Sequence, residues 1–502
     1  MLEKISEILF KYPNRNAFCI NREYYTYYTF AKIISKVRNF IDTNIDISEK
    51  LIGIIANHEQ DIETYSAIYG TLYSGRGYVP INPCNPLERN IEILKQTGIK
   101  TILCRKKYEK LNELAYKLKI KLIEISILPE TQINIELPSV NENEIAYILF
   151  TSGSTGLPKG VPITRKNLNS FIHAFFNLKY DVNENDRFLQ MFELTFDFSV
   201  VCYTIPLCIG ACIYTVPTEG IKFTNVYTTL EENEITFACM VPTVINYLNP
   251  YLEEIKLDKL KYSLFCGEVL HEDTARKWSA CTPNGKIINA YGPTEATVFC
   301  MTYLWDSKFS NKSFNDGVSI GRPMENVEAI VVNEKLKETT NGKKGELCLS
   351  GTQLTQGYLN DKGKIEEAFF NLSLNGEMKR FYRTGDLALI DEDGDFMFAG
   401  RIDDQIKIEG FRIELGEIEH HTREFTKAAN LKAVSAKDER GLNKIHLFIE
   451  NNNKSSEDVS SYLKTKIPAY MLPSTITNLQ SFPFNGNGKV DKKKLITLIK
   501  ND

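Results

Sequence analysis

Residues 151–160 concentrate hydrogen-bond donors on a glycine-rich loop, Thr-Ser-Gly-Ser-Thr-Gly-Leu-Pro-Lys-Gly. The loop follows the apolar run 145–150, which reads as a buried strand. Its glycines let the backbone turn sharply and expose N–H groups. Further donors come from the side chains of Thr151, Ser152, Ser154, Thr155 and Lys159. Because few acceptors compete, the loop suits a polyphosphate better than the alternative, a flexible Gly/Ser linker.

The loop is not a Walker loop, because Gly160 and Val161 follow Lys159 and no hydroxyl is in place to hold magnesium. It instead resembles the phosphate loop of adenylate-forming enzymes, which include acyl-CoA synthetases, luciferases and the adenylation domains of peptide synthetases. In that family a carboxylate attacks the α-phosphate of ATP and pyrophosphate leaves. Further motifs follow in the family's order from about residue 10 to the end of the chain.

A second motif, Asn-Ala-Tyr-Gly-Pro-Thr-Glu at 289–295, follows a strand pattern at 286–288. Alone it could be a Gly-Pro turn with a surface glutamate. The resemblance implies that it borders ATP, with Asn289 and Tyr291 at adenine and Thr294 at the α-phosphate. It also implies that Glu295 holds Mg²⁺, a hard ion that prefers carboxylate and phosphate oxygens. The remaining nucleotide-contacting residues of this motif are Ala290, Gly292 and Pro293.

Three later stretches complete the expected machinery. Asp386, on a glycine turn, can accept both ribose hydroxyls, and the resemblance adds Phe398 and Arg401 beside it. Asp403 matches the pivot of the family's hinge, and the resemblance implies that the C-terminal domain swings about it so that the segment around Gly410 and Phe411 lines a thiol tunnel. Lys489 matches the catalytic lysine that bridges the substrate carboxylate and the α-phosphate, where a positioned cation stabilises developing negative charge.

The hinge motif also carries charges to which we assign no role. Glu409 stands where most members carry a basic or imidazole residue, so a contact of this position with phosphate or pantetheine is not implied. We expect Glu414, Glu417 and Glu419 to be solvated charges of a hairpin.

Asp197 distinguishes between the amino-acid-activating members of the family and the others. In amino-acid-activating members an aspartate at this position pairs with the substrate ammonium, which acyl-CoA synthetases and luciferases do not need. A buried carboxylate without a cation is costly, so Asp197 predicts a charged amine in the pocket. The alternative is a helix N-cap. The other pocket positions are all uncharged: Phe198, Val201, Cys239, Leu264, Cys266, Ala290, Val298 and Phe299.

An uncharged pocket favours a neutral substrate side chain, and two phenylalanines leave room for a small one. The stretch 265–270, Phe-Cys-Gly-Glu-Val-Leu, resembles free-standing D-alanine–carrier protein ligases. Phe198, Ala290 and Phe299 depart from those ligases. D-alanine, L-proline and other small apolar amino acids therefore stay open.

The chain has 502 residues, of which 43% are hydrophobic and 25% charged, so we expect an α/β enzyme of more than one domain. Strand and helix patterns alternate over 45–300, with a helix expected at 62–74 and a strand at 101–104, and predict helix-covered parallel sheets. Short strand patterns over 317–400 predict a small β-barrel or distorted sheet. Residues 1–400 would form the N-terminal domain and residues 401–502 a smaller, mobile α/β domain.

Composition limits partners and location. The net charge of −4 and the absence of a basic stripe argue against nucleic acid as the main partner. The sequence has no run of about 20 apolar residues, so we expect no membrane span. Eleven scattered cysteines without a Cys-x-x-Cys pair favour a reducing cytoplasm. The chain ends thirteen residues after Lys489 with no carrier module, so we expect a separate carrier protein.

The resulting hypothesis is ATP- and Mg²⁺-dependent activation of a small neutral amino acid as aminoacyl-AMP. The aminoacyl group would then pass to the phosphopantetheine thiol of that carrier protein. The alternative is an acyl-CoA synthetase for a small carboxylic acid.

Overall fold

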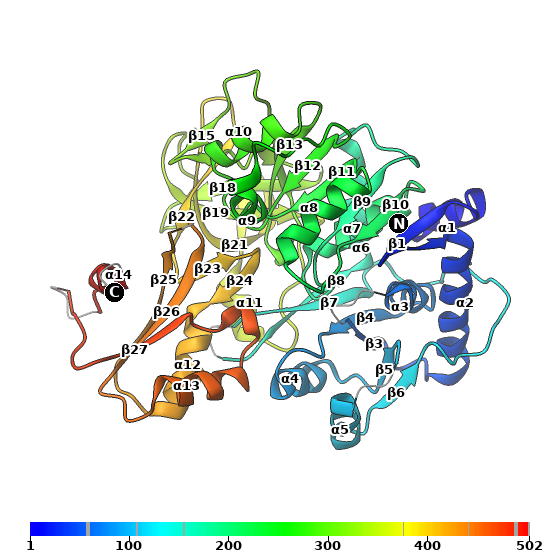
Figure 1. Cartoon of the computed structure of the whole chain (residues 1–502), viewed down its shortest axis with the longest axis horizontal. Coiled ribbons are helices and arrows are strands. Elements are labelled where there is room, and N and C mark those ends of the chain that lie inside the picture. Colours follow the sequence, from blue (N-terminus) through cyan, green and yellow to red (C-terminus); the bar gives the residue numbers. More distant parts are fainter. Residues whose placement is uncertain are drawn as a thin grey trace.

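The computed structural model describes residues 1–56, 61–106, 109–153, 156–374, 376–439, 441–485 and 490–499 (Figure 1), without the side chains of Glu109 and Lys110. Three of the predicted site residues, Ser154, Thr155 and Lys489, lie outside the described residues.

A nine-stranded sheet forms the centre of the large domain, in the order β17-β14-β13-β12-β11-β9-β10-β1-β2. Its strands between β1 and β13 pair in parallel, and β2, β14 and β17 are antiparallel additions at the edges. The strands are β1 (Asn16–Ile20), β2 (Glu23–Thr26), β9 (Arg187–Gln190), β10 (Cys212–Thr215), β11 (Phe237–Met240), β12 (Tyr262–Phe265), β13 (Lys286–Tyr291), β14 (Met301–Trp305) and β17 (Arg322–Pro323).

A six-stranded sheet lies beside it, in the order β6-β5-β3-β4-β7-β8. All its pairs are parallel except β7–β8, whose strands the phosphate loop connects. The strands are β3 (Leu51–Ile55), β4 (Gly77–Ile81), β5 (Thr101–Cys104), β6 (Lys121–Glu124), β7 (Ile145–Thr151) and β8 (Lys159–Thr164).

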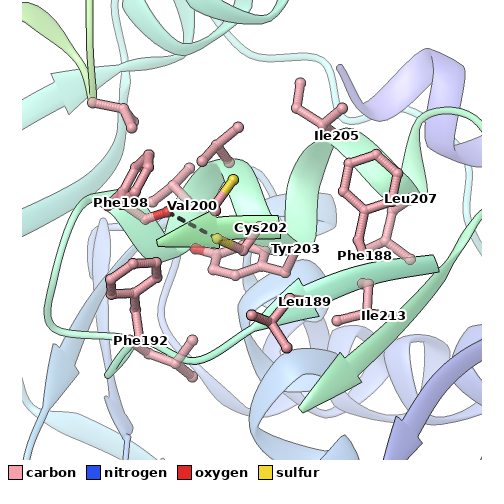
Figure 2. Close-up of a cluster of buried hydrophobic side chains, with 14 of the residues drawn as sticks. Phe188, Leu189, Phe192, Phe198, Val200, Cys202, Tyr203, Ile205, Leu207 and Ile213 are labelled. Carbon is pink, nitrogen blue, oxygen red and sulfur yellow. Dashed lines mark hydrogen bonds between the residues drawn. The ribbon is translucent and has the colours of Figure 1, made fainter. Parts of the chain in front are cut away.

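Helices cover these two sheets, as the alternating pattern predicts. The helix α3 has only Glu63 outside the core, as expected of a helix that is apolar on all sides. The helices of this part are α1 (Leu2–Lys11), α2 (Tyr27–Asn44), α3 (Ile62–Tyr73), α4 (Leu87–Thr97), α5 (Glu109–Leu118), α6 (Arg165–Asn177), α7 (Phe198–Leu207), α8 (Lys222–Glu232), α9 (Thr243–Leu248), α10 (Glu272–Cys281) and the 3₁₀ turns η1 (Asn249–Tyr251) and η2 (Thr294–Ala296). Figure 2 shows how α7 packs its side chains against β9 and β10.

The region 317–400 is a distorted antiparallel sheet in the order β18-β19-β21-β20, with β22 against β21. Its register shifts twice, and the shift between β21 and β22 falls between Asp386 and Ala388. Such irregularities are common next to functional residues. Its elements are β18 (Val327–Val332), β19 (Gly345–Gly351), α11 (Lys362–Ala368), β20 (Phe369–Leu374), β21 (Glu377–Ile390) and β22 (Phe396–Arg401), preceded by the short pair β15 (Ser313–Phe314) and β16 (Gly317–Val318).

The C-terminal part has its own core, built around Ile413, Ile418 and Leu447. It is drawn in orange and red, and its first hairpin, β23–β24, lies beside the large domain (Figure 1). The elements are β23 (Gln405–Ile408), β24 (Phe411–Glu414), α12 (Leu415–Thr426), β25 (Leu431–Lys437), β26 (Asn443–Glu450), α13 (Ser456–Lys464), η3 (Ala469–Met471), β27 (Thr475–Leu479) and α14 (Lys492–Ile499).

The predicted α/β class, with a large domain and a smaller C-terminal one, is confirmed. The predicted strand at 101–104 matches β5, and the predicted helix at 62–74 matches α3 to within one residue. None of the helices in the described ranges combines the length and the apolar character that a bilayer crossing requires.

Candidate active site

The site lies where the parallel strands of both large sheets end. Loops that follow β7, β11, β12 and β13 meet there, which is the usual position of a ligand site in α/β sheets. A cavity of about 520 Å³ is lined by Glu268, Asn289, Tyr291, Asp386 and Arg401, among others. A second cavity, of about 40 Å³, shares Tyr291, Asp386 and Arg401 with it and adds Asp197. The residues predicted for nucleotide and for amino acid thus line adjoining cavities.

The phosphate loop connects two antiparallel strands, and Thr151 of β7 pairs with Lys159 of β8. A Cβ atom on Gly153 would lie 2.1 Å from the Leu157 carbonyl oxygen, so only glycine fits there. The Thr151 Oγ1 atom is buried and has no hydrogen-bond partner among the described residues. Burial, and next the nearby Arg412 guanidinium, lower the pKa of Lys159. The loop therefore keeps a buried hydroxyl and an ammonium that a phosphate oxygen would satisfy.

Asp386 accepts hydrogen bonds from the Tyr291 hydroxyl, at 2.5 Å, and from Arg401. Arg401 also binds both carboxylate oxygens of Asp403, at 2.6 and 2.7 Å. The residue predicted for ribose and the residue predicted as hinge are thus joined through one guanidinium. Phe398 lines the large cavity as well.

Part of the Asn289 side chain makes structural hydrogen bonds within the fold. Its amide nitrogen donates to the carbonyl oxygens of Val318 and Ser319, at 3.2 and 2.8 Å, which leaves its Oδ1 atom for a ligand. The rest of this motif also lies at the site, since Ala290 lines the large cavity, Pro293 the small one, and Gly292 both.

Glu295 is fully buried on η2. Its Oε1 accepts from the Tyr358 hydroxyl at 2.7 Å, and Arg412 Nη1 donates to both of its oxygens, at 3.1 and 2.8 Å. Burial would raise the pKa of Glu295, but the positive charges of Arg412 and Lys159 outweigh burial and lower it. An ionised carboxylate beside the phosphate loop fits the ligand chemistry of Mg²⁺. In this arrangement Arg412 provides its positive counter-charge.

The chain leaves η2 through two residues with positive φ, Thr297 at 57° and Val298 at 72°. Side chains branched at Cβ rarely adopt this conformation, and such strain clusters at functional sites. Here the turn brings Val298 into the lining of the small cavity, next to Asp197.

Asp197 occupies the N-cap position of α7 and is 8% exposed. Its side chain makes no capping hydrogen bond. Its Oδ2 instead accepts from the Thr294 hydroxyl at 2.6 Å. Burial raises the pKa of Asp197 to about 6, against the opposing effects of Thr294 and of the Lys407 charge.

The remaining pocket positions are all buried. Phe198, Cys266 and Val298 line the small cavity with Asp197. The Phe198 ring packs against Phe192 at 4.9 Å between centroids and against Phe299 at 6.3 Å, and Figure 2 shows Phe192 and Phe198 together. The other predicted positions, Val201, Cys239, Leu264 and Phe299, belong to the core around this pocket.

The β23–β24 hairpin is inserted against the site. At its tip, Glu409 and Gly410 have φ values of 51° and 85°, and the Gly410 N–H donates to Glu268 Oε1 at 3.2 Å. Phe411 stacks on Tyr470 at 4.0 Å between centroids and also contacts Phe196. The tip of the hairpin therefore lies against the loop that follows β12 and against Phe196.

The expectation that Glu417 is a solvated charge is wrong. Glu417 is fully buried, pairs with Arg89 Nη1 at 2.5 Å and accepts from the Gly153 N–H at 3.1 Å. Neither Glu414 nor Glu419 is fully solvated, since Glu414 lies 3.8 Å from Lys159 Nζ and Glu419 pairs with Lys432 at 2.8 Å.

Two further residues at the site were not singled out by the sequence. Arg89 carries no motif signal. Glu268 lies in the stretch 265–270, and its carboxylate accepts from both the backbone N–H and the hydroxyl of Thr243.

Comparison with known proteins identifies the family. Residues 7–359 match the family model described as AMP-binding enzyme. The chain is 33% identical over 458 residues to tyrocidine synthase 1 of Brevibacillus parabrevis, covering 89% of this chain and 40% of that protein. It is 32% identical over 460 residues to zwittermicin A synthase ZmaJ of Bacillus cereus, covering 90% of this chain and 86% of that protein.

Among solved structures, the adenylation domain AlmE of Vibrio cholerae, in complex with glycyl-adenosine-5′-phosphate, matches with a TM-score of 0.88 and 26% identity, over 100% of this chain and 97% of that one. The chain belongs to the AMP-binding enzyme family and is a ligase of the adenylate-forming type. It spans less than half of tyrocidine synthase 1.

Proposed function

We propose that this enzyme activates a small neutral amino acid as aminoacyl-AMP at the expense of ATP. It then transfers the aminoacyl group to the phosphopantetheine thiol of a carrier protein supplied as a separate chain. In the first half-reaction the amino-acid carboxylate attacks the α-phosphate and pyrophosphate leaves. In the second, the thiol attacks the carbonyl carbon and AMP leaves.

The proposal assigns a role to specific residues in each half-reaction. Thr151, Ser152, Ser154, Thr155 and Lys159 hold the β- and γ-phosphates. Tyr291 and Asp386 bind adenosine, and Lys489 bridges the reacting groups. Glu295 would hold Mg²⁺, which supplies positive charge to the phosphates when bound. Asp403 is the hinge between the two arrangements, because one small domain serves both steps.

The observation that carries the proposal is the Asp197 carboxylate, which is buried, makes no capping hydrogen bond and lines the same cavity as Tyr291 and Asp386. Among the described residues it has no ion-pair partner, so a substrate ammonium would provide the missing charge. An acid without an amino group would leave this carboxylate unpaired, which argues against the acyl-CoA synthetase alternative.

The packing of Phe198 on Phe192 and Phe299 favours the smallest side chains, so within the proposal glycine and alanine rank above proline. AlmE is a similar protein that was solved with glycyl-adenosine-5′-phosphate, and this bound molecule is consistent with a small amino acid as the substrate.

The test is ATP–pyrophosphate exchange with glycine, both alanine enantiomers, L-proline and serine, and with acetate and propionate as controls. We expect exchange that depends on glycine or alanine. Exchange with the carboxylic acids alone would overturn the proposal in favour of an acyl-CoA synthetase. Exchange with no acid dependence would point to a nucleotide-binding homologue without amino-acid activity.

A further inference from the structure

Two histidines and a glutamate of α12 face one another in the middle of the helix, which is labelled in Figure 1. Glu424 follows His420 by four residues and His421 by three, and these spacings bring side chains together on a helix. The His421 Nδ1 atom lies 3.4 Å from Glu424 Oε2, and the His420 Nε2 atom lies 3.8 Å from Glu424 Oε1. One possible metal-ligand atom of each residue lies within 4.8 Å of those of the other two.

A contact with the phosphate loop determines which nitrogen of His421 carries a proton. The His421 Nε2 atom lies 3.2 Å from the Gly156 carbonyl oxygen. A carbonyl oxygen can only accept, so we infer that Nε2 carries the proton and that the neutral ring has its lone pair on Nδ1. That lone pair faces a Glu424 oxygen, which is also an acceptor. A neutral His421 therefore needs a cation between Nδ1 and Glu424.

Both imidazole rings are oriented by the same glycine. The His421 side chain is only 12% exposed and is held by its contact with Gly156. A Cβ atom on Gly156 would lie 2.3 Å from His420 Cδ2, so the His420 ring lies directly against the glycine backbone. A metal-bound histidine usually donates its second N–H to a backbone carbonyl or a carboxylate, and this fixes its tautomer. His421 has this arrangement.

The ligand types and their separations fit a divalent transition metal. Ligand atoms about 2.0–2.2 Å from a tetrahedral ion lie about 3.3–3.6 Å from one another, which is close to the 3.4 and 3.8 Å of the two histidine–glutamate contacts. Two imidazoles and a carboxylate favour Zn²⁺, whereas Mg²⁺ prefers oxygen ligands. A cavity of about 380 Å³, lined by His421 and Gly156 among others, leaves room for water at the remaining position.

The glutamate of this cluster is not neutralised by a basic side chain. Among the described residues no lysine or arginine forms an ion pair with Glu424, whose side chain is 50% exposed. The ammonium of Lys466, whose charge interacts with Glu424, forms an ion pair with Glu88 at 2.5 Å. The carboxylate is therefore available to a metal ion that the two histidines also bind.

We propose that His420 Nε2, His421 Nδ1 and the Glu424 carboxylate form a binding site for Zn²⁺ on α12. The ion keeps the His421 Nε2–H directed at the Gly156 carbonyl oxygen of the phosphate loop. The site is separate from Glu295, where Mg²⁺ would bind, and goes beyond the proposed function, because it does not depend on which amino acid is the substrate.

The test is titration calorimetry of Zn²⁺ into the full chain without an added histidine tag, at pH 7.5 in excess Mg²⁺ and without ATP or amino acid. We expect a stoichiometry of about one Zn²⁺ per chain that excess Mg²⁺ does not displace. His421→Gln and Glu424→Gln should each weaken binding by about 10-fold or more, because each removes one of three protein ligands. Circular dichroism shows whether the variants remain folded.

The matched control is His173→Gln on α6. His173 also lies near a glutamate, with its Nε2 atom 3.6 Å from Glu325 Oε1, but the described residues place no second histidine, cysteine or acid there to complete a metal site. We expect less than about a 2-fold change in Zn²⁺ affinity for this variant.

Nitrogen NMR of the histidine rings provides a second measurement. Zn²⁺ should shift the Nδ1 resonance of His421 and leave its Nε2 protonated. A His421 that carries protons on both nitrogens and does not respond to Zn²⁺ would overturn the proposal, because a proton would then fill the place of the ion.

The calorimetry can also refute the site. Absence of Zn²⁺ binding, displacement by Mg²⁺, or unchanged affinity in folded His421→Gln and Glu424→Gln would overturn the proposal, since Zn²⁺ held by cysteine thiolates would survive both substitutions. These measurements use neither ATP nor amino acid. Absence of amino-acid-dependent exchange in the wild type would count against the proposed function alone.

Discussion

We expect the Asp197 carboxylate to be required for activity but not for the stability of the fold. Its carboxylate is 8% exposed and accepts a 2.6 Å hydrogen bond from Thr294. Asparagine has the same shape and keeps an acceptor for that hydroxyl. We therefore expect Asp197→Asn to raise the free energy of unfolding of the substrate-free protein while it strongly impairs amino-acid activation.

The magnitude follows from the pKa of Asp197, which burial raises from 3.8 to about 6. At 1.36 kcal/mol per unit, ionising this group in the folded state costs about 3 kcal/mol above pH 6. Because the pKa of Asp197 is higher in the folded state, the stability that this group contributes to the wild type is present below pH 3.8 and is lost as the pH rises through about 6. The advantage of asparagine should be about 3 kcal/mol at pH 7.5 and about half of that at pH 5.

Urea denaturation of both proteins at the two pH values measures this difference. The loss of the ammonium partner in Asp197→Asn should lower kcat/KM for the amino acid by roughly 10²–10³-fold, measured by exchange. In the wild type the same kcat/KM should fall as the pH drops below about 6, because Asp197 then takes up a proton. A variant that is less stable than the wild type at pH 7.5 and still exchanges with the same amino acid would refute the reasoning.

Three other substitutions separate the parts of the site. Gly410→Ala should block thioester formation and spare exchange, because a Cβ atom there would lie 2.7 Å from Val241 Cγ1 at a φ of 85°. Single-turnover transfer to the carrier measures thioester formation. Normal transfer would show that the position of the β23–β24 hairpin at the site is not needed for this step. Lys489→Ala should show the reverse pattern, with exchange lost and thioester formation from supplied aminoacyl-AMP retained. Phe198→Ala should shift exchange toward larger amino acids such as valine, by about 10-fold in relative kcat/KM, because it removes a phenyl ring from the pocket. An unchanged preference would show that another residue limits the size of the substrate.

The parts of the fold that the sequence predicts well are those set by local patterns. The run at 101–104 is apolar, β-branched and short, and it is β5 without a shift of either end. The donor-rich loop was found because glycines and hydroxyls gather directly after a buried strand, and it does join β7 to β8. That Lys159 begins an antiparallel strand was not predicted, because residues 159–164 lack a distinct strand signal beside the glycines.

The site residues were found mainly by resemblance, and physical reasoning alone would have left several of them open. Asp197 before an apolar segment fits an N-cap as well as a ligand, and it does occupy the N-cap position of α7, without a side-chain capping hydrogen bond. Asn289 was expected at adenine, yet its amide nitrogen supports the turn at Val318 and Ser319, a contact between segments about 30 residues apart. Such tertiary partners leave no mark in local spacing.

Glu417 shows where sequence reasoning fails for a physical reason. It follows Leu415 and precedes Ile418 on an amphipathic helix, and both of these pack in the core of the C-terminal domain. A charge on the opposite side of such a helix is normally solvated, and in the isolated domain it would be. Its burial comes from Gly153, 264 residues earlier in the chain, and from Arg89. The carboxylate satisfies the Gly153 N–H from a part of the chain that has its own core. A charged residue on the outer face of such a domain is therefore better judged against the neighbouring domain's surface than against the domain that carries it.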